Sequence, residues 1–202
     1  IPVASEFRRD CEIYIKELVR WNQKINLTAI KEQEEILIKH ILCSLSYLKA
    51  FTPKPGLRAI DIGSGAGIPG IPIKLYSAEI SLTLLEPSQK KLAFLKHIGR
   101  LLQLKDIAYL GISVESLNLV ESFDLAFARG FGPLSRLVKK TGRILRTGGI
   151  LLVRKEESYL SEIITAAPII ARKGLKLHRV IRINLERPGM RYFILAFKKC
   201  ST

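Results

Sequence analysis

A glycine-rich run lies between a short apolar segment and a segment with a helical pattern. It reads Ala-Ile-Asp-Ile-Gly-Ser-Gly-Ala-Gly-Ile-Pro-Gly over residues 59–70. The apolar residues 57–62 predict a buried strand, and residues 68–76 predict a helix with Pro69 near its first turn. Glycines at such a junction let the backbone approach a ligand, and the first turn of the helix offers unpaired N–H groups. The run therefore predicts an α/β fold with a ligand-binding loop after its first strand.

After this run, short apolar segments alternate with amphipathic ones. The alternation is typical of βαβ units, in which a parallel sheet carries helices on both faces. The expected strands are 57–62, 80–85, 107–110, 123–127 and 149–153, and the expected helices are 68–76, 88–102 and 133–145. Two further apolar segments, 175–185 and 191–198, flank a turn signal at 186–189, so we expect them to pair antiparallel. The predicted fold is a mostly parallel, seven-stranded sheet that ends in an antiparallel hairpin.

The first 56 residues have a different pattern. Apolar side chains recur at helical spacing over residues 6–20 and again over 32–50. The Pro- and Gly-containing residues 52–56 then stop the second helix. We expect an N-terminal helical cap over residues 1–56, packed on a core over residues 57–202, and one compact unit overall.

The chain is strongly basic. Its 33 Lys and Arg side chains against 18 Asp and Glu give a formal net charge of +15, and residues 129–155 contain eight bases and no acid. Such a field favours polyanions, nucleic acid above all, because each neutralised phosphate releases a counterion. The side chains of this segment that we expect to bind phosphates are Arg136, Lys139, Lys140, Arg143 and Lys155.

The composition also excludes several classes of protein. With 48% hydrophobic and 25% charged residues, the chain is not of the disordered class. It contains no apolar run near the roughly 18 residues that a membrane span needs, and its first residues lack the pattern of a secretory signal. Cys11, Cys43 and Cys200 are far apart and unaccompanied by clustered histidines, which excludes a disulfide framework and a standard zinc site. We expect a cytoplasmic protein without a metal.

Two carboxylates accompany the glycine run. Asp61 immediately precedes the loop, and Glu86 ends the second expected strand. Gly65, Gly67 and Gly70 also match G-x-G-x-x-G, the spacing of dinucleotide-binding folds. Asp61 would repel a pyrophosphate but attract an ammonium or sulfonium group, whereas Glu86 can bind ribose hydroxyls of either cofactor. Together they favour S-adenosylmethionine over NAD, and a glycine turn with a buried capping Asp61 is the structural alternative.

The fourth expected strand ends near Arg129. Ligands of open parallel sheets bind outside the carboxyl ends of the strands, so we expect Arg129 to face a crevice shared by cofactor and substrate. A solvated loop arginine is the alternative. Neither an Asn/Asp-Pro-Pro-aromatic run for exocyclic amines nor a cysteine near a strand end for pyrimidine C5 is present here. A ring nitrogen such as guanine N7 already has a lone pair, so transfer to it needs only alignment and desolvation, with Arg129 as the candidate catalytic residue.

Several short motifs together resemble one protein family. They are WN…NLTAI over residues 21–30, His40…Ser44-Leu45, DIGSGAGIPGIP over 61–72, Lys90-Lys91…Phe94-Leu95, Val114-Glu115 and Ala128-Arg129. In this order and spacing, from about residue 10 to about 198, the chain closely resembles the bacterial small-subunit rRNA guanine-N7 methyltransferases, long called glucose-inhibited division protein B. The resemblance implies a class I, Rossmann-like methyltransferase fold that uses S-adenosylmethionine. It also implies methyl transfer to N7 of a guanine in 16S rRNA.

The resemblance further implies which residues line the cofactor pocket. The positions that match the family's binding residues are Gly63, Ile68, Val114, Glu115 and Arg129. They add to Asp61, Gly65 and Gly67 of the glycine run and to Glu86 at the end of the second expected strand. Glu115 would accept from the adenine amino group or hold the neighbouring backbone. Departures from the family's usual residues occur at Cys43 (Asp), Glu86-Pro87 (Asp-Ser), Ser113 (Arg), Ala128 (Ser), Gly130 (Ala) and Glu156 (Gly). The change at Ser113 removes an expected charge partner of Glu115.

Five other side chains have competing interpretations. We expect Trp21 to form a hydrophobic staple that ties the cap to the sheet rather than to stack on a base. Asn26 and Thr28 either cap the following helix or reach the mouth of the crevice. His40 is expected to pack or cap rather than to catalyse, and His97 is expected to be solvated.

Three other functions stay open at this point. They are a methyltransferase acting on a small metabolite, a non-catalytic RNA-binding factor on a methyltransferase scaffold, and an NAD oxidoreductase. The expected partner is 16S rRNA or an assembling small ribosomal subunit, and the protein is expected to be monomeric.

Overall fold

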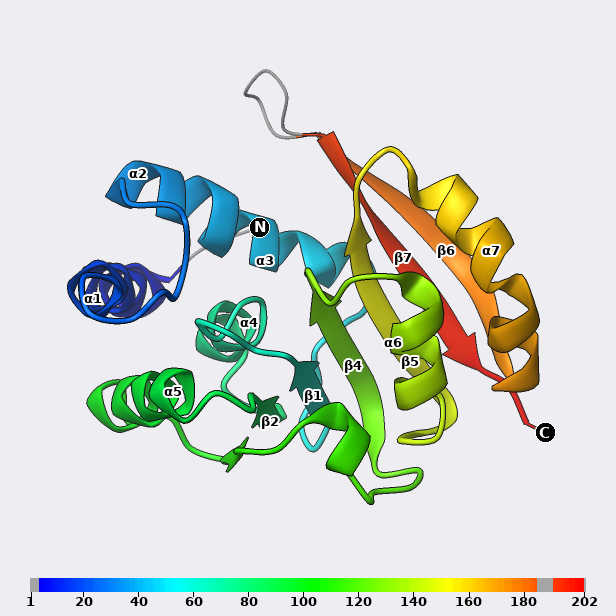
Figure 1. The fold of residues 1–202 in the computed structure, drawn as a ribbon. Coiled ribbons are helices and arrows are strands. Elements are labelled where there is room, and N and C mark those ends of the chain that lie inside the picture. The colour runs from blue at the N-terminus through cyan, green and yellow to red at the C-terminus, as the bar shows by residue number, and fades with distance from the viewer. Residues whose placement is uncertain (1–3, 185–190, 202) are drawn as a thin grey trace.

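A computed structural model describes residues 4–184 and 191–201, which form a seven-stranded sheet (Figure 1). The strands are β1 (Arg58–Ile62), β2 (Ser81–Leu85), β3 (Ile107–Leu110), β4 (Phe123–Arg129), β5 (Leu145–Lys155), β6 (Leu175–Asn184) and β7 (Arg191–Lys199). Their order is β3-β2-β1-β4-β5-β7-β6, with β1 to β5 parallel and β7 antiparallel to both β5 and β6. The predicted mostly parallel sheet with a C-terminal antiparallel pair is confirmed. The turn predicted at 186–189 lies outside the described residues.

Helices cover both faces of this sheet (Figure 1). They are α1 (Ser5–Asn22), α2 (Gln33–Ile36), α3 (Cys43–Leu45), α4 (Gly70–Tyr76), α5 (Gln89–Leu101), α6 (Leu134–Thr141) and α7 (Tyr159–Arg172), with the π-helical turn η1 (Leu37–Leu42) and the 3₁₀ turns η2 (Ser46–Lys49) and η3 (Val114–Ser116). The helices α1, α4 and α5 lie on one side of the sheet, and α6 and α7 lie on the other.

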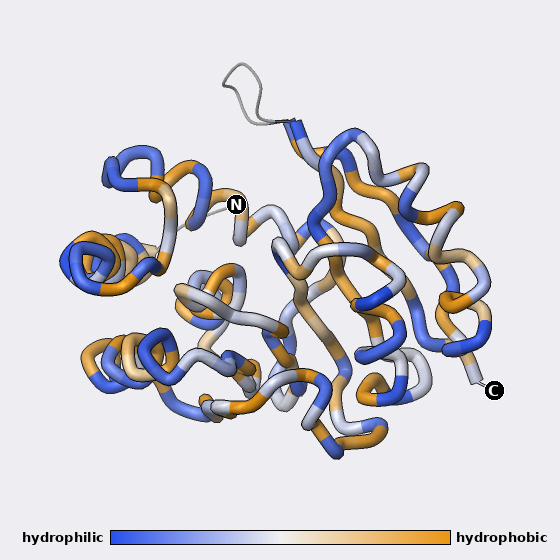
Figure 2. The backbone as a smooth tube through the Cα atoms, in the orientation of Figure 1, coloured by the Kyte–Doolittle hydropathy of each residue, from blue (hydrophilic) through white to orange (hydrophobic). Residues whose placement is uncertain are grey.

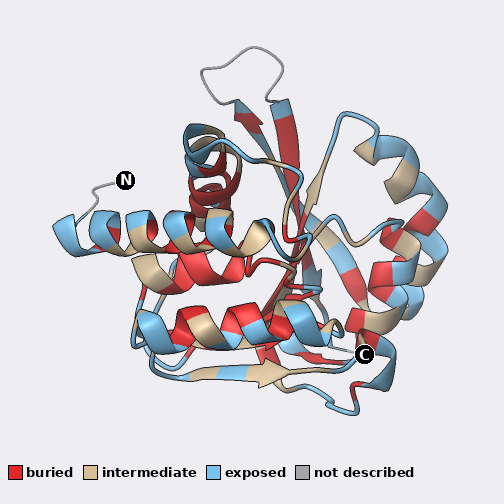
Figure 3. Cartoon of the chain, turned by 60° about the vertical axis from the view of Figure 1, so that its left-hand side comes forward, coloured by how far each residue is buried: buried red, intermediate tan, exposed pale blue. Residues whose placement is uncertain are grey.

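The sheet separates two hydrophobic cores because successive side chains of a strand point to opposite faces. On β4, Leu125 and Phe127 join the core under α1, α4 and α5, whereas Ala126 and Ala128 join the core under α6 and α7. A parallel sheet buried on both faces requires a nearly continuous apolar strand, and β4 is such a strand. Figure 2 shows hydrophobic residues along the strands of the sheet, and Figure 3 shows buried residues there.

The first helix anchors the glycine loop. Its side chains at positions i, i+4, i+7, i+8 and i+11 are buried, which confirms the helix predicted over 6–20. Tyr14 on this face donates its hydroxyl to the Ala66 carbonyl, at 2.6 Å. At the end of the helix, the Trp21 ring lies 5.7 Å from the Phe94 ring of α5, so the staple interpretation is confirmed. The prediction that His97 is solvated is wrong, because its Nε2 lies 2.6 Å from Glu17 Oε2 and its ring lies against Trp21.

The prediction of one regular helix over 32–50 is wrong, although the segment is helical. It is divided into α2, η1, α3 and η2, with a wide π turn in the middle. The Ser44 hydroxyl donates to the His40 carbonyl and the Ser46 hydroxyl donates to the Cys43 carbonyl, both at 2.6 Å, so side chains compete with the helical hydrogen bonds here. The helix begins at Gln33 and has Glu32 as its N-cap, so the option that Asn26 or Thr28 caps it is wrong.

Two further boundaries differ from the prediction. The helix expected over 133–145 is α6, which ends at Thr141, and β5 begins at Leu145 rather than 149.

The helix α7 was not predicted. Its solvent face carries Leu160 and Ile164, which are 60% and 75% exposed, and Pro168 lies inside it, so both the amphipathic pattern and the breaker signal point away from a helix. Within the described residues, no helix is sufficiently long and apolar to cross a membrane.

We predict that Tyr14→Phe lowers the free energy of unfolding by about 1–3 kcal/mol, because the buried Ala66 carbonyl loses its partner. Tyr47→Phe is the matched control. Tyr47 is equally buried, but its hydroxyl lies 3.4 Å from the Ala128 carbonyl oxygen, a weak bond, so the loss should be smaller. Urea unfolding of the three proteins measures the difference. Equal losses in both variants would show that Tyr14 does not anchor the loop through its hydroxyl.

Candidate active site

The candidate residues meet at one edge of the sheet because the carboxyl ends of parallel strands lie side by side. The glycine loop follows β1, Glu86 follows β2, η3 follows β3, and Arg129 ends β4. Register brings these ends together, since Ile62 at the end of β1 pairs with Leu85 of β2 and with Ala128 of β4. The topology therefore places the loop between Glu86 and Arg129.

The glycines of the loop divide into two kinds. A Cβ at Gly67 would lie 2.4 Å from Ile71 Cδ1, and a Cβ at Gly70 would lie 2.8 Å from Asp61 Oδ2, so these two glycines are required by packing. Gly63 and Gly65 have positive φ angles, +69° and +58°, and a Cβ at either position would make no close contact. A Cβ at Gly65 would meet only the Gly63 carbonyl oxygen, at 3.9 Å. The loop thus forms a backbone cradle at Gly63 and Gly65 that fits the close approach of a ligand.

This geometry argues against a dinucleotide. In the dinucleotide fingerprint the second glycine, here Gly67, lets the backbone approach the pyrophosphate, which binds at the N-terminus of the following helix. In this chain, Gly67 faces Ile71 and Leu95 of the protein itself. The first amide of α4 is also already bonded, because Gly70 N–H donates to Asp61 Oδ2 at 2.9 Å. The residues present fit S-adenosylmethionine better than NAD.

Asp61 is buried behind the cradle. Only 1% of the residue is exposed, and one carboxylate oxygen caps α4 while the other, Oδ1, has no partner among the described residues. Burial raises the pKa of Asp61 to about 7, and the Gly70 N–H and the Arg129 charge only partly oppose this. The geometry therefore matches the capping interpretation of Asp61. Its influence on a cationic ligand would act through the electrostatic field rather than through contact.

Glu86 ties the cradle to β2. Its Oε2 accepts from Gly65 N–H at 2.8 Å, and its Oε1 accepts from Ser88 N–H at 3.0 Å. The residue is 6% exposed. A carboxylate has about four acceptor sites, so both oxygens keep capacity for hydroxyl donors after these two bonds.

Arg129 lies at the end of β4, and it is not a solvated loop arginine. Its Nη2 lies 3.1 Å from Nδ1 of the buried His40, and its Nη1 is buried without a partner among the described residues. Burial first, and then the charge of Arg154, lower the pKa of Arg129. His40 is packed, as expected, and burial together with Arg129 lowers its pKa to about 4.

The loop after β4 brings in a residue that sequence reasoning missed. Phe131 lies between Gly130 and Gly132, whose φ angles are +65° and +89°. Its ring covers Gly63, where an added Cβ would lie 3.5 Å from the ring. An aromatic residue between two glycines, directly after a strand end, is the sequence signal that could have identified it.

Arg136 connects this loop to η3. Its guanidinium lies 5.7 Å from the Phe131 ring centre and 3.4 Å from Glu115 Oε1. The pKa of Glu115 is lowered mainly by its own backbone N–H, and also by the Ser113 hydroxyl and Arg136. The charge partner that Ser113 does not provide thus comes from Arg136, a residue that the sequence analysis assigned to phosphate binding.

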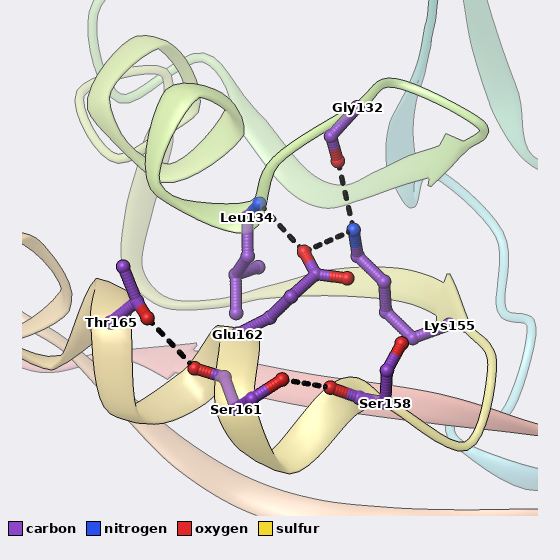
Figure 4. A network of polar contacts seen from close by, with 7 residues as sticks. All are labelled: Gly132, Leu134, Lys155, Ser158, Ser161, Glu162 and Thr165. Carbon is purple, nitrogen blue, oxygen red and sulfur yellow. Dashed lines mark hydrogen bonds and ion pairs between the residues drawn. The ribbon is translucent and has the colours of Figure 1, made fainter.

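A cavity of about 600 Å³ opens beside Arg129 at the ends of β4 and β5. It is lined by residues 129–133 and 153–156, with Leu137, Ser158 and Glu162. Figure 4 shows the network on its wall: Glu162 Oε2 accepts from Leu134 N–H at 3.0 Å and lies 2.6 Å from Lys155 Nζ, which also donates to the Gly132 carbonyl at 2.8 Å. The network ties the start of α6, the end of β5 and α7 together.

The five predicted phosphate ligands therefore differ in availability. The Lys155 side chain is 13% exposed and neutralised by Glu162. Arg143 donates to the Leu117 carbonyl, and Arg136 is paired with Glu115. Lys139 and Lys140 lie on α6, the first exposed and the second half-buried. These two lysines are the members of the set best placed for an external polyanion.

The fold and this site define a class of protein. Similar architectures occur in M. jannaschii TYW2 in complex with AdoMet (TM-score 0.61, 19% identity, covering 77% of this chain and 76% of that chain) and in a SAM dependent methyltransferase from Aquifex aeolicus (TM-score 0.62, 16% identity, covering 82% and 93%). The chain has the Rossmann-like fold of S-adenosylmethionine-dependent methyltransferases.

Sequence comparison identifies the particular family. A family model for rRNA small subunit methyltransferase G matches residues 8–187. Relatives with the name ribosomal RNA small subunit methyltransferase G include those of Caldanaerobacter subterraneus (38% identical, 90% of this chain and 77% of the relative) and Dictyoglomus thermophilum (38% identical, 86% and 74%). The chain belongs to the rRNA small subunit methyltransferase G family, and the resemblance found from its motifs is confirmed.

The buried Asp61 predicts a pH dependence of stability. Its pKa is about 7 in the folded protein against an ordinary value of 3.8, so the folded state binds the proton more tightly. The resulting stabilisation is complete below about pH 4 and is lost as the pH rises through 7. Asp61→Asn keeps an acceptor for Gly70 N–H but does not titrate. We expect the free energy of unfolding of the parent, minus that of Asp61→Asn, to fall between pH 4 and 7 in urea titrations; a constant difference would contradict this.

Proposed function

We propose that this chain transfers the methyl group of S-adenosylmethionine to N7 of a guanine in 16S rRNA, with Arg129 at the transfer site. The observation that carries the proposal is a half-buried arginine at the end of β4 beside the glycine cradle, in a chain of the rRNA small subunit methyltransferase G family. We take the protein to act as a monomer in the cytoplasm, on free 16S rRNA or on an assembling small subunit.

The cofactor side of the site is formed by the first three strand ends. The backbone at Gly63 and Gly65 would allow the close approach of the cofactor, Glu86 would accept from its ribose hydroxyls, and Val114 and Glu115 would hold its adenine. The remaining predicted pocket residues, Asp61, Gly67 and Ile68, support the loop from behind. S-adenosylmethionine, when bound, supplies an electrophilic methyl group on a positively charged sulfonium. The buried Asp61 carboxylate provides a field of opposite sign, which is strong because little water screens it.

The acceptor side is the cavity beside Arg129. Its volume of about 600 Å³ lies in the range of ordinary ligand pockets, and Phe131 on its wall offers an aromatic surface. A guanine that leaves its stack in the rRNA gains such stacking in return. The N7 lone pair is available at neutral pH, so the residues here need only hold the base in line with the methyl group and exclude water. Arg129 borders both sides and has one unpartnered guanidinium nitrogen among the described residues to donate to a bound group.

The decisive test is transfer of labelled methyl to rRNA from a methylation-deficient strain, followed by mapping of the modified nucleotide. We predict label at N7 of one guanine, and about a hundredfold or greater loss of turnover in Arg129→Ala, because a positioned donor at a transfer site contributes about that much. Arg58→Ala is the matched control, since this exposed arginine lies at the opposite end of β1 and should leave turnover unchanged.

Each alternative function has its own result in this test. Label that appears only in small metabolites would indicate a small-molecule methyltransferase. Absence of S-adenosylmethionine binding in calorimetry would indicate a non-catalytic RNA-binding scaffold. Wild-type turnover in Arg129→Ala, with unchanged cofactor affinity, would remove Arg129 from the transfer site.

Lys139 and Lys140 are the predicted phosphate contacts. We predict that Lys139→Ala with Lys140→Ala weakens rRNA binding and reduces the magnitude of the slope of log K against log salt by about 1.4 to 1.8, since each lost phosphate contact removes about 0.7–0.9. The affinity for S-adenosylmethionine should not change. The control is Lys54→Ala with Lys105→Ala, two exposed lysines that precede β1 and β3 at the opposite edge of the sheet. Equal slopes for the two double variants would place the RNA interface elsewhere.

A further inference from the structure

Asn22, in the last turn of α1, fixes the loop that follows it. Its Oδ1 accepts from Leu27 N–H at 2.9 Å and from Thr28 N–H at 3.0 Å, and its Nδ2 donates to the Thr28 carbonyl at 2.8 Å. One amide side chain therefore satisfies both backbone groups of Thr28. This leaves Thr28 in a defined place although no regular secondary structure surrounds it.

Thr28 in turn contacts His40. Its Oγ1 accepts from Ile30 N–H at 3.1 Å and lies 2.8 Å from His40 Nε2. His40 lies on the π-helical turn η1 and is 5% exposed. In Figure 1, the helical segment from α2 to α3, which contains η1, runs toward the carboxyl end of β4. The π-helical turn thus places the His40 imidazole between Thr28 in the loop and the carboxyl end of β4.

His40 then contacts Arg129, with 3.1 Å between Nδ1 and Nη2. A guanidinium can only donate, so Nδ1 accepts and carries no proton. The proton of the neutral ring is therefore on Nε2, which donates to Thr28 Oγ1. Burial and the Arg129 charge lower the pKa of His40 to about 4, which keeps the ring in this neutral form at pH 7. Each hydrogen bond between Asn22 and Arg129 therefore has a defined donor and a defined acceptor.

The acceptor for Arg129 is uncharged, and this matters for its chemistry. Among residues 4–184 and 191–201, no carboxylate lies within ion-pair distance of Arg129, although Arg154 is close enough to lower the pKa of Arg129. A carboxylate would hold the guanidinium but would also neutralise it. A neutral imidazole fixes its direction and leaves its charge for a bound group.

We propose that His40, held by Thr28 and Asn22, is the positioning residue of Arg129 and orients the guanidinium at the transfer site through a neutral acceptor. The proposal rests on the proposed function, because it assumes that Arg129 acts on the cofactor or the acceptor base. His40 itself is not a proton acceptor for the substrate, since both ring nitrogens are already bonded. The contacts also give the motif residues Asn22, Thr28 and His40 a shared role outside the cofactor pocket.

Two substitutions at His40 test the contacts of its two ring nitrogens separately. The side-chain oxygen of His40→Asn overlays Nδ1 and can accept from Arg129, whereas the amide of His40→Gln overlays Nε2 and can reach Thr28 but leaves Arg129 without its acceptor. We expect His40→Asn to keep turnover within a few fold of the parent and His40→Gln to lose about tenfold or more, the size expected for a lost charge-assisted hydrogen bond. A merely structural role would not rank the two variants in this order. The reverse order, or equal losses, would overturn the proposal.

A double-mutant cycle provides the second measurement. If His40 acts through Arg129, His40→Gln has no further effect in an Arg129→Ala background. Effects that multiply would show that His40 acts independently, and would also overturn the proposal. Urea unfolding of all four proteins checks that the differences are not differences in folded fraction.

The cycle is run with two readouts, so that this inference and the proposed function fail separately. One is turnover on rRNA, and the other is the dissociation constant of S-adenosylmethionine from calorimetry. If the parent methylates no rRNA but the two residues are coupled in cofactor affinity, the proposed function fails and the positioning role stands. If the parent methylates rRNA and neither readout shows coupling, the positioning role is wrong and the function stands.

Discussion

The pairing of β1 with β4 is the contact on which the site depends. The strand order runs outward from β1 to β2 and β3 on one side, and from β4 to β5 on the other. The direction in which successive strands are added to the sheet therefore reverses between β1 and β4, although these two strands are parallel. Loops that leave neighbouring strands on opposite sides of such a reversal diverge and open a crevice. The glycine loop therefore turns toward α4 and the Phe131 loop toward α6, with Arg129 between them. The placement of the glycine loop, Arg129 and Phe131 around one crevice follows from this reversal of strand order.

Asp61 and Arg129, at the crevice, each have one buried polar atom without a hydrogen-bond partner among the described residues. Asp61 has one unpartnered oxygen, Arg129 has one unpartnered nitrogen, and both are nearly free of solvent. Unpaired buried charge is costly, which is why the pKa values of both groups shift toward the neutral form. Cys43 is buried near Arg129 and adds no carboxylate there. A cationic cofactor would favour the charged form of Asp61, so ligand binding and this unfavourable burial are coupled.

Much of the fold could be predicted from sequence, because parallel strands buried on both faces give continuous apolar runs and glycine marks the first junction. β1 and β2 lie within about one residue of their predicted ends. The errors have local causes. α7 was missed because Leu160 and Ile164 face solvent, and the π turn at His40 depends on hydroxyl bonds from Ser44 that no periodicity reports. The family residues could be placed by motif, but their partners could not: no spacing predicts that Arg129 meets a histidine 89 positions away.

The charge of the basic segment in sequence does not show which of its bases are paired with acids after folding. Eight bases between residues 129 and 155 suggest a continuous polyanion surface, yet folding distributes them differently. Arg146 pairs with Asp124, Arg136 with Glu115 and Lys155 with Glu162, while Arg129 and Arg154 lie inside the site. An acid distant in sequence cancels a base as effectively as an adjacent one, because Coulomb energy depends on spatial separation. Lys139 and Lys140, in the last turn of α6, have neither an ion pair nor a hydrogen bond from their side chains among the described residues, so we propose these two bases as the RNA contacts of the segment.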